Sequence, residues 1–248
     1  MSALALSCAV RTDPGPVRPH NEDAAFATAK LAAVADGVGG HAAGEVASRT
    51  VVGVLASLEK AWVDEPLDAA LAGAVAEGNE RIAFLMECRP ETAGMGTTLT
   101  AVALCGDYVV VNIGDSRTYL LRDGDLRRLT RDDSYLQELI DAGVVTPEAA
   151  RTHPRRNVVT AALDGAAGRA ATIAHVPARA GDRLLLCSDG LSDVLDEPRI
   201  AALLAQPDAA GAADALVRAA LDAGARDNVT AVVADAVPVA APVPWVRA

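Results

Sequence analysis

Residues 97–129 read TTLTAVALCGDYVVVNIGDSRTYLLRDGDLRRL. This stretch holds four strand-like runs, at residues 97–104, 108–113, 118–122 and 126–129. Gly106-Asp107 and Asp123-Gly124 lie between runs, at the places that two-residue hairpin turns occupy. Consecutive strands joined by hairpins pair antiparallel. The stretch therefore predicts an antiparallel sheet and argues against alternating strands and helices.

Helices and further strands are predicted on either side of this stretch. Residues 44–62 carry apolar side chains at near-helical spacing, and Pro66 opens a second helical stretch that extends to residue 85. These two helices should pack side by side. Further strands are predicted at residues 4–12, 24–35, 171–176, 183–188 and 229–234, and further helices at residues 198–204 and 209–223. Mixed strands with segregated helix pairs indicate an α+β layered domain.

Residues 133–164 interrupt this pattern. They hold a short predicted helix at residues 135–142, which ends at Gly143, and a further helical turn that begins at Pro147. The segment is too polar for the core and too structured for a linker. We expect it to form a small inserted lobe, called the flap below.

The composition excludes several classes of protein. The 248 residues suffice for one large core, and 51% of them are hydrophobic but only 3% are aromatic, so the core must consist of Ala, Val and Leu. A net charge of −11 disfavours binding to nucleic acid and to anionic membranes. The N-terminus has no basic region followed by a long apolar stretch, and the longest uncharged stretch, residues 92–106, has the pattern of a loop and a strand. We therefore expect a cytoplasmic protein without a membrane span.

Four aspartates lie at the ends of apolar strand-like runs, three of them beside a glycine. They are Asp36, Asp115, Asp189 and Asp227. A lone aspartate at such a place usually caps a helix or makes a turn. Carboxylates at the rims of several strands can instead converge in space and form an oxygen cage for a hard divalent cation. The recurrence of the pattern predicts a metal-dependent enzyme.

Six short motifs occur in order along the chain. They are 17-VRPHNED-23, 35-ADGVGGH-41, 94-GMGTT-98, 113-IGDSR-117, 187-CSDGL-191 and 227-DNVT-230. Together they resemble the bacterial branch of the type 2C metal-dependent Ser/Thr protein phosphatases, over residues 6–233. The resemblance implies a β-sandwich of two antiparallel sheets flanked by antiparallel helix pairs, in four layers α-β-β-α. Residues 1–236 would form the phosphatase catalytic domain, with the flap at about 133–164, and the Pro- and Ala-rich residues 237–248 a tail.

The resemblance also implies a metal site with two Mn²⁺ or Mg²⁺ ions and a third, weaker position. Asp36 would bridge the two ions, and the carbonyl of Gly37 would be a further ligand. The remaining ligands follow: Asp189 and Asp227 at the first ion, Asp23 and Glu22 near the second directly or through water, and Asp115 at the third. The alternative for Asp115 is a strand-edge residue paired with Arg117.

Two further residues match family positions with chemical roles. Arg18 would grip the substrate phosphate through its guanidinium fork, the alternative being a surface arginine in a Pro-rich loop. His41 would protonate the leaving alkoxide, the alternative being a polar loop residue before a helix. Asp133, in the flap, departs from the family, because relatives commonly have histidine there.

The implied reaction is hydrolysis of phosphoserine and phosphothreonine in proteins by a metal-bridged water, which would reverse Ser/Thr kinase signalling. Phosphorylated proteins, Ser/Thr protein kinases and the substrates of those kinases are the expected partners. Two alternatives remain at this stage. One is a catalytically impaired sensor that binds phosphoproteins, and the other is a phosphohydrolase of small phosphate esters.

Overall fold

A computed structural model describes residues 3–39, 43–62, 66–150 and 153–239 of the chain. Within these residues, two five-stranded sheets pack face to face, and every strand pairing is antiparallel. The first sheet contains, in spatial order, β1 (Ala3–Asp13), β12 (Val229–Val239), β11 (Arg183–Cys187), β8 (Arg117–Arg122) and β9 (Asp125–Arg128). The second contains β10 (Thr172–Val176), β7 (Asp107–Ile113), β6 (Leu99–Cys105), β3 (Leu31–Ala35) and β2 (Ala24–Ala27). A separate short ribbon pairs β4 (Gly37–Val38) with β5 (Gly96–Thr97).

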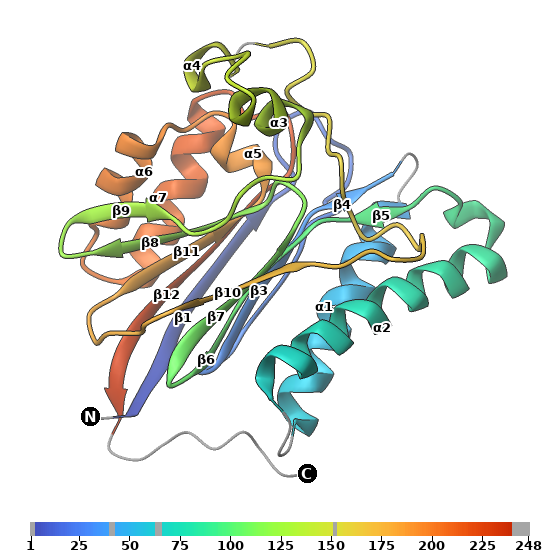
Figure 1. Cartoon of the computed structure of the whole chain (residues 1–248). Helices are drawn as coiled ribbons and strands as arrows, with labels where there is room; N and C mark the ends of the chain where they lie inside the picture. Colours follow the sequence, from blue (N-terminus) through green and yellow to red (C-terminus); the bar gives the residue numbers. More distant parts are fainter. Residues whose placement is uncertain (1–2, 40–42, 63–65, 151–152, 240–248) are drawn as a thin grey trace.

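Two pairs of helices cover the outer faces of the sheets. The helices α1 (Ala43–Ala61) and α2 (Leu67–Cys88) pack on the second sheet, and α6 (Glu197–Leu204) and α7 (Ala209–Asp222) pack on the first (Figure 1). The short 3-10 turn at Pro90–Thr92 follows α2. The four layers α-β-β-α confirm the predicted α+β sandwich.

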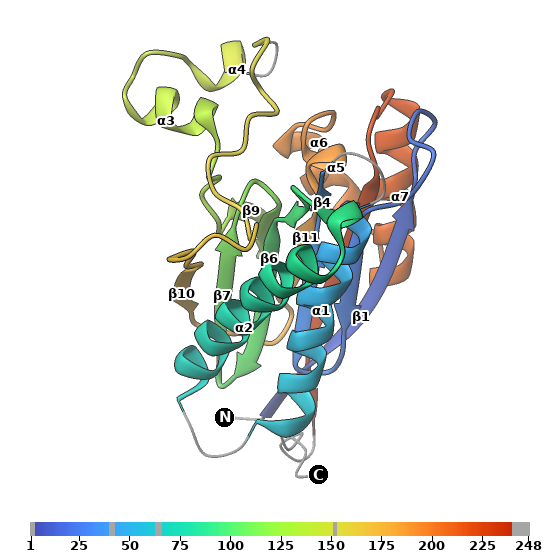
Figure 2. The ribbon, with the colours of Figure 1, turned by 90° about the vertical axis from the view of Figure 1, so that its right-hand side faces the viewer.

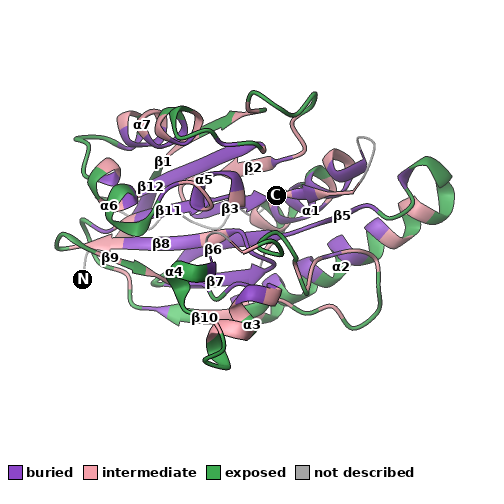
Figure 3. Cartoon of the chain, turned by 90° about the horizontal axis from the view of Figure 1, so that it is seen from above, coloured by how far each residue is buried: buried purple, intermediate pink, exposed green. Residues whose placement is uncertain are grey.

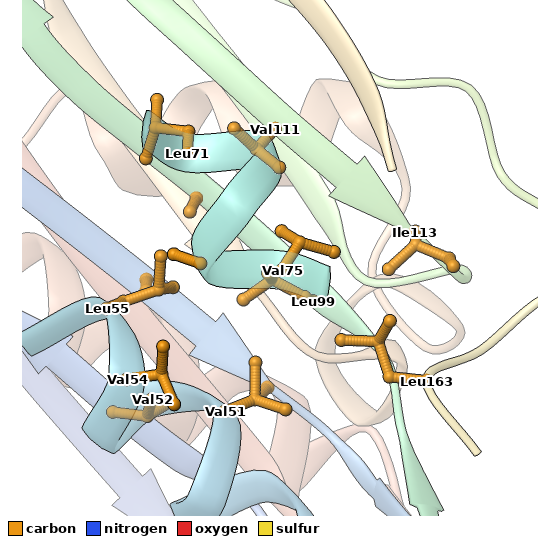
Figure 4. Packing of buried hydrophobic residues seen from close by; sticks show 14 of the residues in the cluster. Val51, Val52, Val54, Leu55, Leu71, Val75, Leu99, Val111, Ile113 and Leu163 are labelled. Atoms are coloured by element: carbon orange, nitrogen blue, oxygen red, sulfur yellow. The ribbon is translucent and has the colours of Figure 1, made fainter. Parts of the chain in front are cut away.

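Each sheet is buried on both of its faces, which explains the continuous apolar strands. Successive strand residues point to opposite faces. In β3, therefore, Leu31 packs toward α1 and α2, while Val34 packs between the two sheets. Figure 4 shows the outer layer of this core, where Val51 and Leu55 from α1 and Val75 from α2 gather against the sheet. Small Ala and Val side chains thus form most of three apolar layers.

The hairpin turns differ in detail. Arg122 pairs with Asp125 across Asp123 and Gly124, which both have positive φ, of 53° and 85°. This is the predicted two-residue turn. At the other predicted turn the pairing begins one residue earlier, because Asp107 already pairs with Cys105 and Gly106 alone turns the chain.

Several elements differ from the sequence prediction. The strand predicted at 24–35 is the hairpin of β2 and β3, because the Thr28 hydroxyl accepts hydrogen bonds from the backbone N–H groups of Lys30 and Leu31 and turns the chain. Strand β12 continues to Val239, since residues 237–239 pair with β1. The predicted tail therefore begins inside this strand, and residues 240–248 lie outside the described residues. The helix α5 (Asp189–Ser192) is absent from the prediction.

The flap forms a separate small lobe at one end of the sandwich (Figures 1 and 2). It contains α3 (Tyr135–Asp141) and α4 (Pro147–Ala150), and half of its described residues are exposed (Figure 3). Its base is closed by an antiparallel bridge between Ser134 and Val159. The chain leaving it is held at Leu163, which exchanges two backbone hydrogen bonds with Thr97.

Candidate metal centre

The strand ends that carry the predicted aspartates meet at one end of the sandwich, below the flap. Asp36 follows β3, and Asp115 lies in the turn between β7 and β8. Asp189 is the first residue of α5, directly beyond β11, and Asp227 precedes β12. The strand registers align these ends, because Cys187, the last residue of β11, pairs with the first residue of β8 and the third of β12. The hairpin topology thus brings distant carboxylates together.

Burial and mutual repulsion raise the pKa values of these carboxylates. Burial raises the pKa of Asp36 well above its ordinary value, and the charges of Asp23 and Asp189 raise it further. Burial, followed by the charge of Asp115, also raises the pKa of Asp189. Burial raises the pKa of Asp23 to about 6 and that of Asp115 to about 7. Such a cluster resists carrying negative charge unless a cation compensates it.

Asp23 is clamped on one side and open on the other. Its Oδ2 accepts hydrogen bonds from the hydroxyls of Ser188, at 2.8 Å, and Thr230, at 2.6 Å. Its Oδ1 is buried and accepts no hydrogen bond, and the same holds for Oδ1 of Asp189. Sequence reasoning missed the two hydroxyls, although both lie in the quoted motifs, Ser188 directly before Asp189 and Thr230 three residues after Asp227. Two buried carboxylate oxygens are therefore left for a ligand that supplies positive charge.

Glycines allow the backbone segments of this end to touch. A Cβ on Gly37 would lie 2.3 Å from the carbonyl oxygen of Gly44 and 2.5 Å from that of Glu22. A Cβ on Gly190 would lie 2.1 Å from the carbonyl oxygen of Asn228. No side chain fits at these distances. Gly37 and Gly190 are therefore required by the close approach of neighbouring backbone segments, and not only by the turn in which each lies.

Asn228 ties the loop between β1 and β2 to this end. Its side-chain amide donates to the carbonyl oxygens of Pro14 and His20, both at 2.9 Å, and its Oδ1 accepts from the backbone N–H of Glu22 at 2.8 Å. The loop carries Arg18, whose Nη2 lies 2.6 Å from Oδ2 of Asp227. The predicted phosphate grip and a predicted metal ligand are therefore direct neighbours.

Asp115 does not make the ion pair that was its alternative explanation. Arg117 instead forms hydrogen bonds to both carboxylate oxygens of Asp132, at 2.6–3.0 Å. Another acidic residue, Asp193, raises the pKa of Asp115 through its charge and follows Asp189 by one turn of α5. Asp193 lies four residues after Asp189, a spacing that brings two side chains to the same face of a helix. Because α5 was not predicted from the sequence, this relation was not recognised there. His41 lies outside the described residues.

The donor chemistry fits divalent metal ions, although the described side chains do not form a ready ligand set. Hard cations prefer carboxylate and carbonyl oxygens, and those are the groups gathered here. Among the described residues, no three Asp, Glu, His or Cys side chains stand in an arrangement that could hold an ion as it is. The ion pair of Asp227 with Arg18 occupies one of the predicted ligands. The buried, unpartnered oxygens of Asp23 and Asp189 carry the fit.

Two of the cavities in the described part of the chain lie near α6. One, of about 670 Å³, lies between α6 and α7 and is lined by residues such as Arg199 and Arg218, away from the aspartates. The other, of about 630 Å³, lies between the flap, α5 and α6, and Asp115 and Asp189 form part of its wall. The second cavity is therefore the space beside the candidate metal centre.

Comparison with known proteins identifies the class that this fold and acidic end define. Residues 19–224 match the protein phosphatase 2C family, and the chain belongs to that family. Serine/threonine protein phosphatase PstP of Mycobacterium tuberculosis is 50% identical over 238 residues, which cover 94% of this chain and 46% of PstP. Serine/threonine phosphatase stp of Listeria welshimeri is 37% identical over 235 residues, covering 89% of this chain and 92% of stp.

A solved structure of a related domain has the same fold and contains one of the metals expected from the sequence. The crystal structure of the catalytic domain of PstP in complex with two manganese ions has a TM-score of 0.89 at 48% identity, and the match covers 95% of this chain and all of that one. The chain spans about half the length of PstP. No helix among the described residues has the length and apolar character needed to cross a membrane.

Proposed function

We propose that this chain is a metal-dependent protein-serine/threonine phosphatase, which hydrolyses phosphoserine and phosphothreonine in proteins. The observation that carries the proposal is the gathering of Asp23, Asp36 and Asp189 at one end of the sandwich, with two buried carboxylate oxygens that accept no hydrogen bond. Membership in the protein phosphatase 2C family and the likeness to the manganese-bound domain of PstP support it.

The proposed metal ligands are the strand-end carboxylates. Asp36 would serve both of two Mn²⁺ or Mg²⁺ ions, with the carbonyl of Gly37 beside it. The other proposed ligands are Asp189 and Asp227 for the first ion, Asp23 and Glu22 for the second, and Asp115 for a third. Bound divalent ions supply an activated water and neutralise phosphate charge.

Arg18 is proposed to bind the phosphate of the substrate. About half of its side chain is exposed, so it can reach a ligand from solvent. Its guanidinium is already oriented toward the carboxylate cluster by Asp227. A substrate phosphate would compete with Asp227 for the N–H donors of the Arg18 guanidinium. The guanidinium can donate two parallel hydrogen bonds, and this geometry matches a pair of phosphate oxygens. For His41 we propose the role of general acid, which rests on its place in the motif alone.

Direct attack of water needs no protein nucleophile. Cys187 is the cysteine nearest in sequence to Asp189, but burial raises the pKa of its thiol to about 12. The thiol therefore stays protonated at neutral pH and is a poor nucleophile. Cys105, the last residue of β6, is exposed.

The proposed partners are phosphorylated proteins, among them Ser/Thr protein kinases and their substrates. A cytoplasmic location is proposed as well. All four cysteines are free thiols, and two of them, Cys88 and Cys105, are exposed. Free exposed thiols are typical of a reducing compartment.

The experiment that tests this function measures phosphate release from a phosphothreonine peptide. The wild type is assayed with Mn²⁺ and with EDTA, and Asp36→Asn is assayed with Mn²⁺. We expect turnover that requires the metal and falls at least about a hundredfold in the variant, because the amide carries no charge to bind two cations. Mn²⁺ binding by calorimetry should weaken in parallel.

Asp222→Asn, at the exposed end of α7, is the matched control and should retain both activity and Mn²⁺ binding. Metal-independent turnover, or none, in the wild type would contradict the proposal. Hydrolysis of small phosphate esters without peptide hydrolysis would favour the small-ester phosphohydrolase instead.

A further inference from the structure

The cavity beside the carboxylate cluster, called the flap cavity here, has a wall that combines apolar and acidic groups. Its volume is about 630 Å³, and its lining extends from Asp115 and Asp189 to the flap. Figure 1 shows α3 and α4 of the flap at the same end of the molecule as α5 and α6. A substrate segment next to a phosphoresidue at the proposed metal centre would therefore lie beside this cavity.

The apolar part of the wall comes from both sides of the cavity. Leu136 and Ile140 contribute from α3, Pro147 from α4, and Leu195 from the segment after α5. Leu136 and Leu195 are only 6% and 5% exposed, so they form a fixed apolar surface. Such a surface suits the aliphatic part of a side chain.

The arginines of the wall already have carboxylate partners. Arg117 and Arg128 both contact Asp132, at 2.6 and 3.5 Å. Arg156, in the flap, lies 3.9 Å from Asp193. Asp132 and Asp193 therefore offset two of these three positive charges, and the arginines leave little attraction for an acidic substrate.

Three carboxylates of the wall lack such partners. They are Glu148 on the flap and Asp196 and Glu197 at the start of α6. All three are exposed, which places them where the cavity opens to solvent, and none forms an ion pair with another described residue. The carboxylate of Asp196 accepts the backbone N–H of Arg199 and caps α6. Among the described residues, the mouth of the cavity thus carries more negative than positive charge, and this excess does not depend on whether metal ions occupy Asp115 and Asp189.

We propose that the flap cavity binds a lysine or arginine side chain that flanks the phosphoresidue of the protein substrate. The stem of such a side chain would pack on Leu136 and Ile140, while its charged head would meet Glu148 and Glu197, since long basic side chains bury their stems and keep their heads at a polar rim. The assignment rests on the proposed phosphatase function and names a substrate class for it: phosphoproteins with a basic residue near the phosphorylated position.

Matched phosphothreonine peptides test this assignment. The peptides share one sequence and carry Arg, Gln or Glu in turn at each position flanking the phosphothreonine. The ratio of kcat/KM between Arg and Glu peptides is measured for the wild type and for the double variant Glu148→Gln, Glu197→Gln. Asp196 is left unchanged because it caps α6. Glu80→Gln on α2, outside the cavity lining, is the control for a loss of negative charge alone.

We expect the wild type to prefer the Arg peptide over the Glu peptide about tenfold at low salt at one or more positions, through KM, with the preference shrinking at high salt. The double variant should reduce the ratio to about twofold, and Glu80→Gln should keep it. Because the ratio is taken within each variant, a general loss of activity does not affect it, and circular dichroism reports whether the variant is folded.

Equal turnover of Arg and Glu peptides in the wild type, or an unchanged ratio in the double variant, would overturn the cavity assignment alone. Hydrolysis of p-nitrophenyl phosphate by the wild type without hydrolysis of any phosphopeptide would overturn the proposed function, and the assignment with it.

Discussion

Asp23 illustrates how one buried carboxylate is divided between the protein and a ligand. Two hydroxyls hold Oδ2, and Oδ1 has no donor. Thr230 has a second contact, since its hydroxyl lies 2.7 Å from that of Thr12. Thr230 is fully buried. Its hydroxyl should therefore contribute substantially to the stability of the fold, because a buried hydrogen bond to a charged group is costly to lose.

Thr230→Val should test the hydroxyl of Thr230. We expect the free energy of unfolding of the metal-free protein to fall by about 2 kcal/mol at pH 7.5, measured by urea denaturation. Thr230→Ser keeps the hydroxyl and loses only a methyl group, so it should cost about 1 kcal/mol. Equal losses in the two variants would mean that the methyl packing, and not the hydrogen bond to Asp23, is what matters.

At the scale of elements, Asp133 connects the base of the flap to two other chain segments through hydrogen bonds. Oδ2 of Asp133 accepts the backbone N–H of Gly114 at 3.0 Å, and the Asp133 N–H donates to the Gly114 carbonyl at 2.9 Å. The Asp133 carbonyl accepts from Thr160 at 2.8 Å. Asp133 therefore joins the flap to the turn that carries Asp115.

Asp133→Ala should loosen the flap without unfolding the sandwich. Loss of a hydrogen bond to a carboxylate should speed amide hydrogen exchange at the flap base about tenfold. The amides to follow are those of Tyr135 and Thr160, which bond to Val158 and Asp133. Amides of β11 and β12 serve as internal controls. Uniform acceleration across the sheets, or none at the flap base, would contradict this role for the side chain of Asp133.

At the scale of the whole molecule, the carboxylate cluster links stability to pH and to metal. Carboxylates with raised pKa values in the folded state, such as Asp23 at about 6 and Asp115 at about 7, remain protonated there at pH values where the unfolded chain has released its protons. The metal-free protein therefore loses stability as the pH rises from about 4 through 7. Cations that replace those protons should reverse the loss.

We expect the melting temperature in EDTA to fall between pH 5 and pH 8. Added Mn²⁺ should raise it by several degrees at pH 8 and by much less at pH 5, because protons compete with the metal for the same oxygens. Differential scanning calorimetry at both pH values measures this. An equal Mn²⁺ effect at the two pH values would show that the ions bind away from these carboxylates.

The sequence by itself determined the elements and the chemistry of the site. Apolar periodicity and the Asp123-Gly124 turn fixed an antiparallel fold with two helix pairs, because those signals are local along the chain. The strand-end aspartates indicated a cation site, because the pattern recurs at four strand ends whose carboxylates can converge in space. The short helix α5 was not predicted, since four residues are too few to show a helical periodicity.

Only the tertiary structure decided which groups touch across the fold. The hydroxyls of Ser188 and Thr230 donate hydrogen bonds to Asp23 across sequence separations of 165 and 207 residues. Arg117 forms its ion pair with Asp132 and not with Asp115. No local pattern encodes such contacts, because they depend on the register of both sheets and on how the sheets stack. The flap cavity is of the same kind: its apolar and acidic walls come from segments that the chain brings together only when the sandwich has closed.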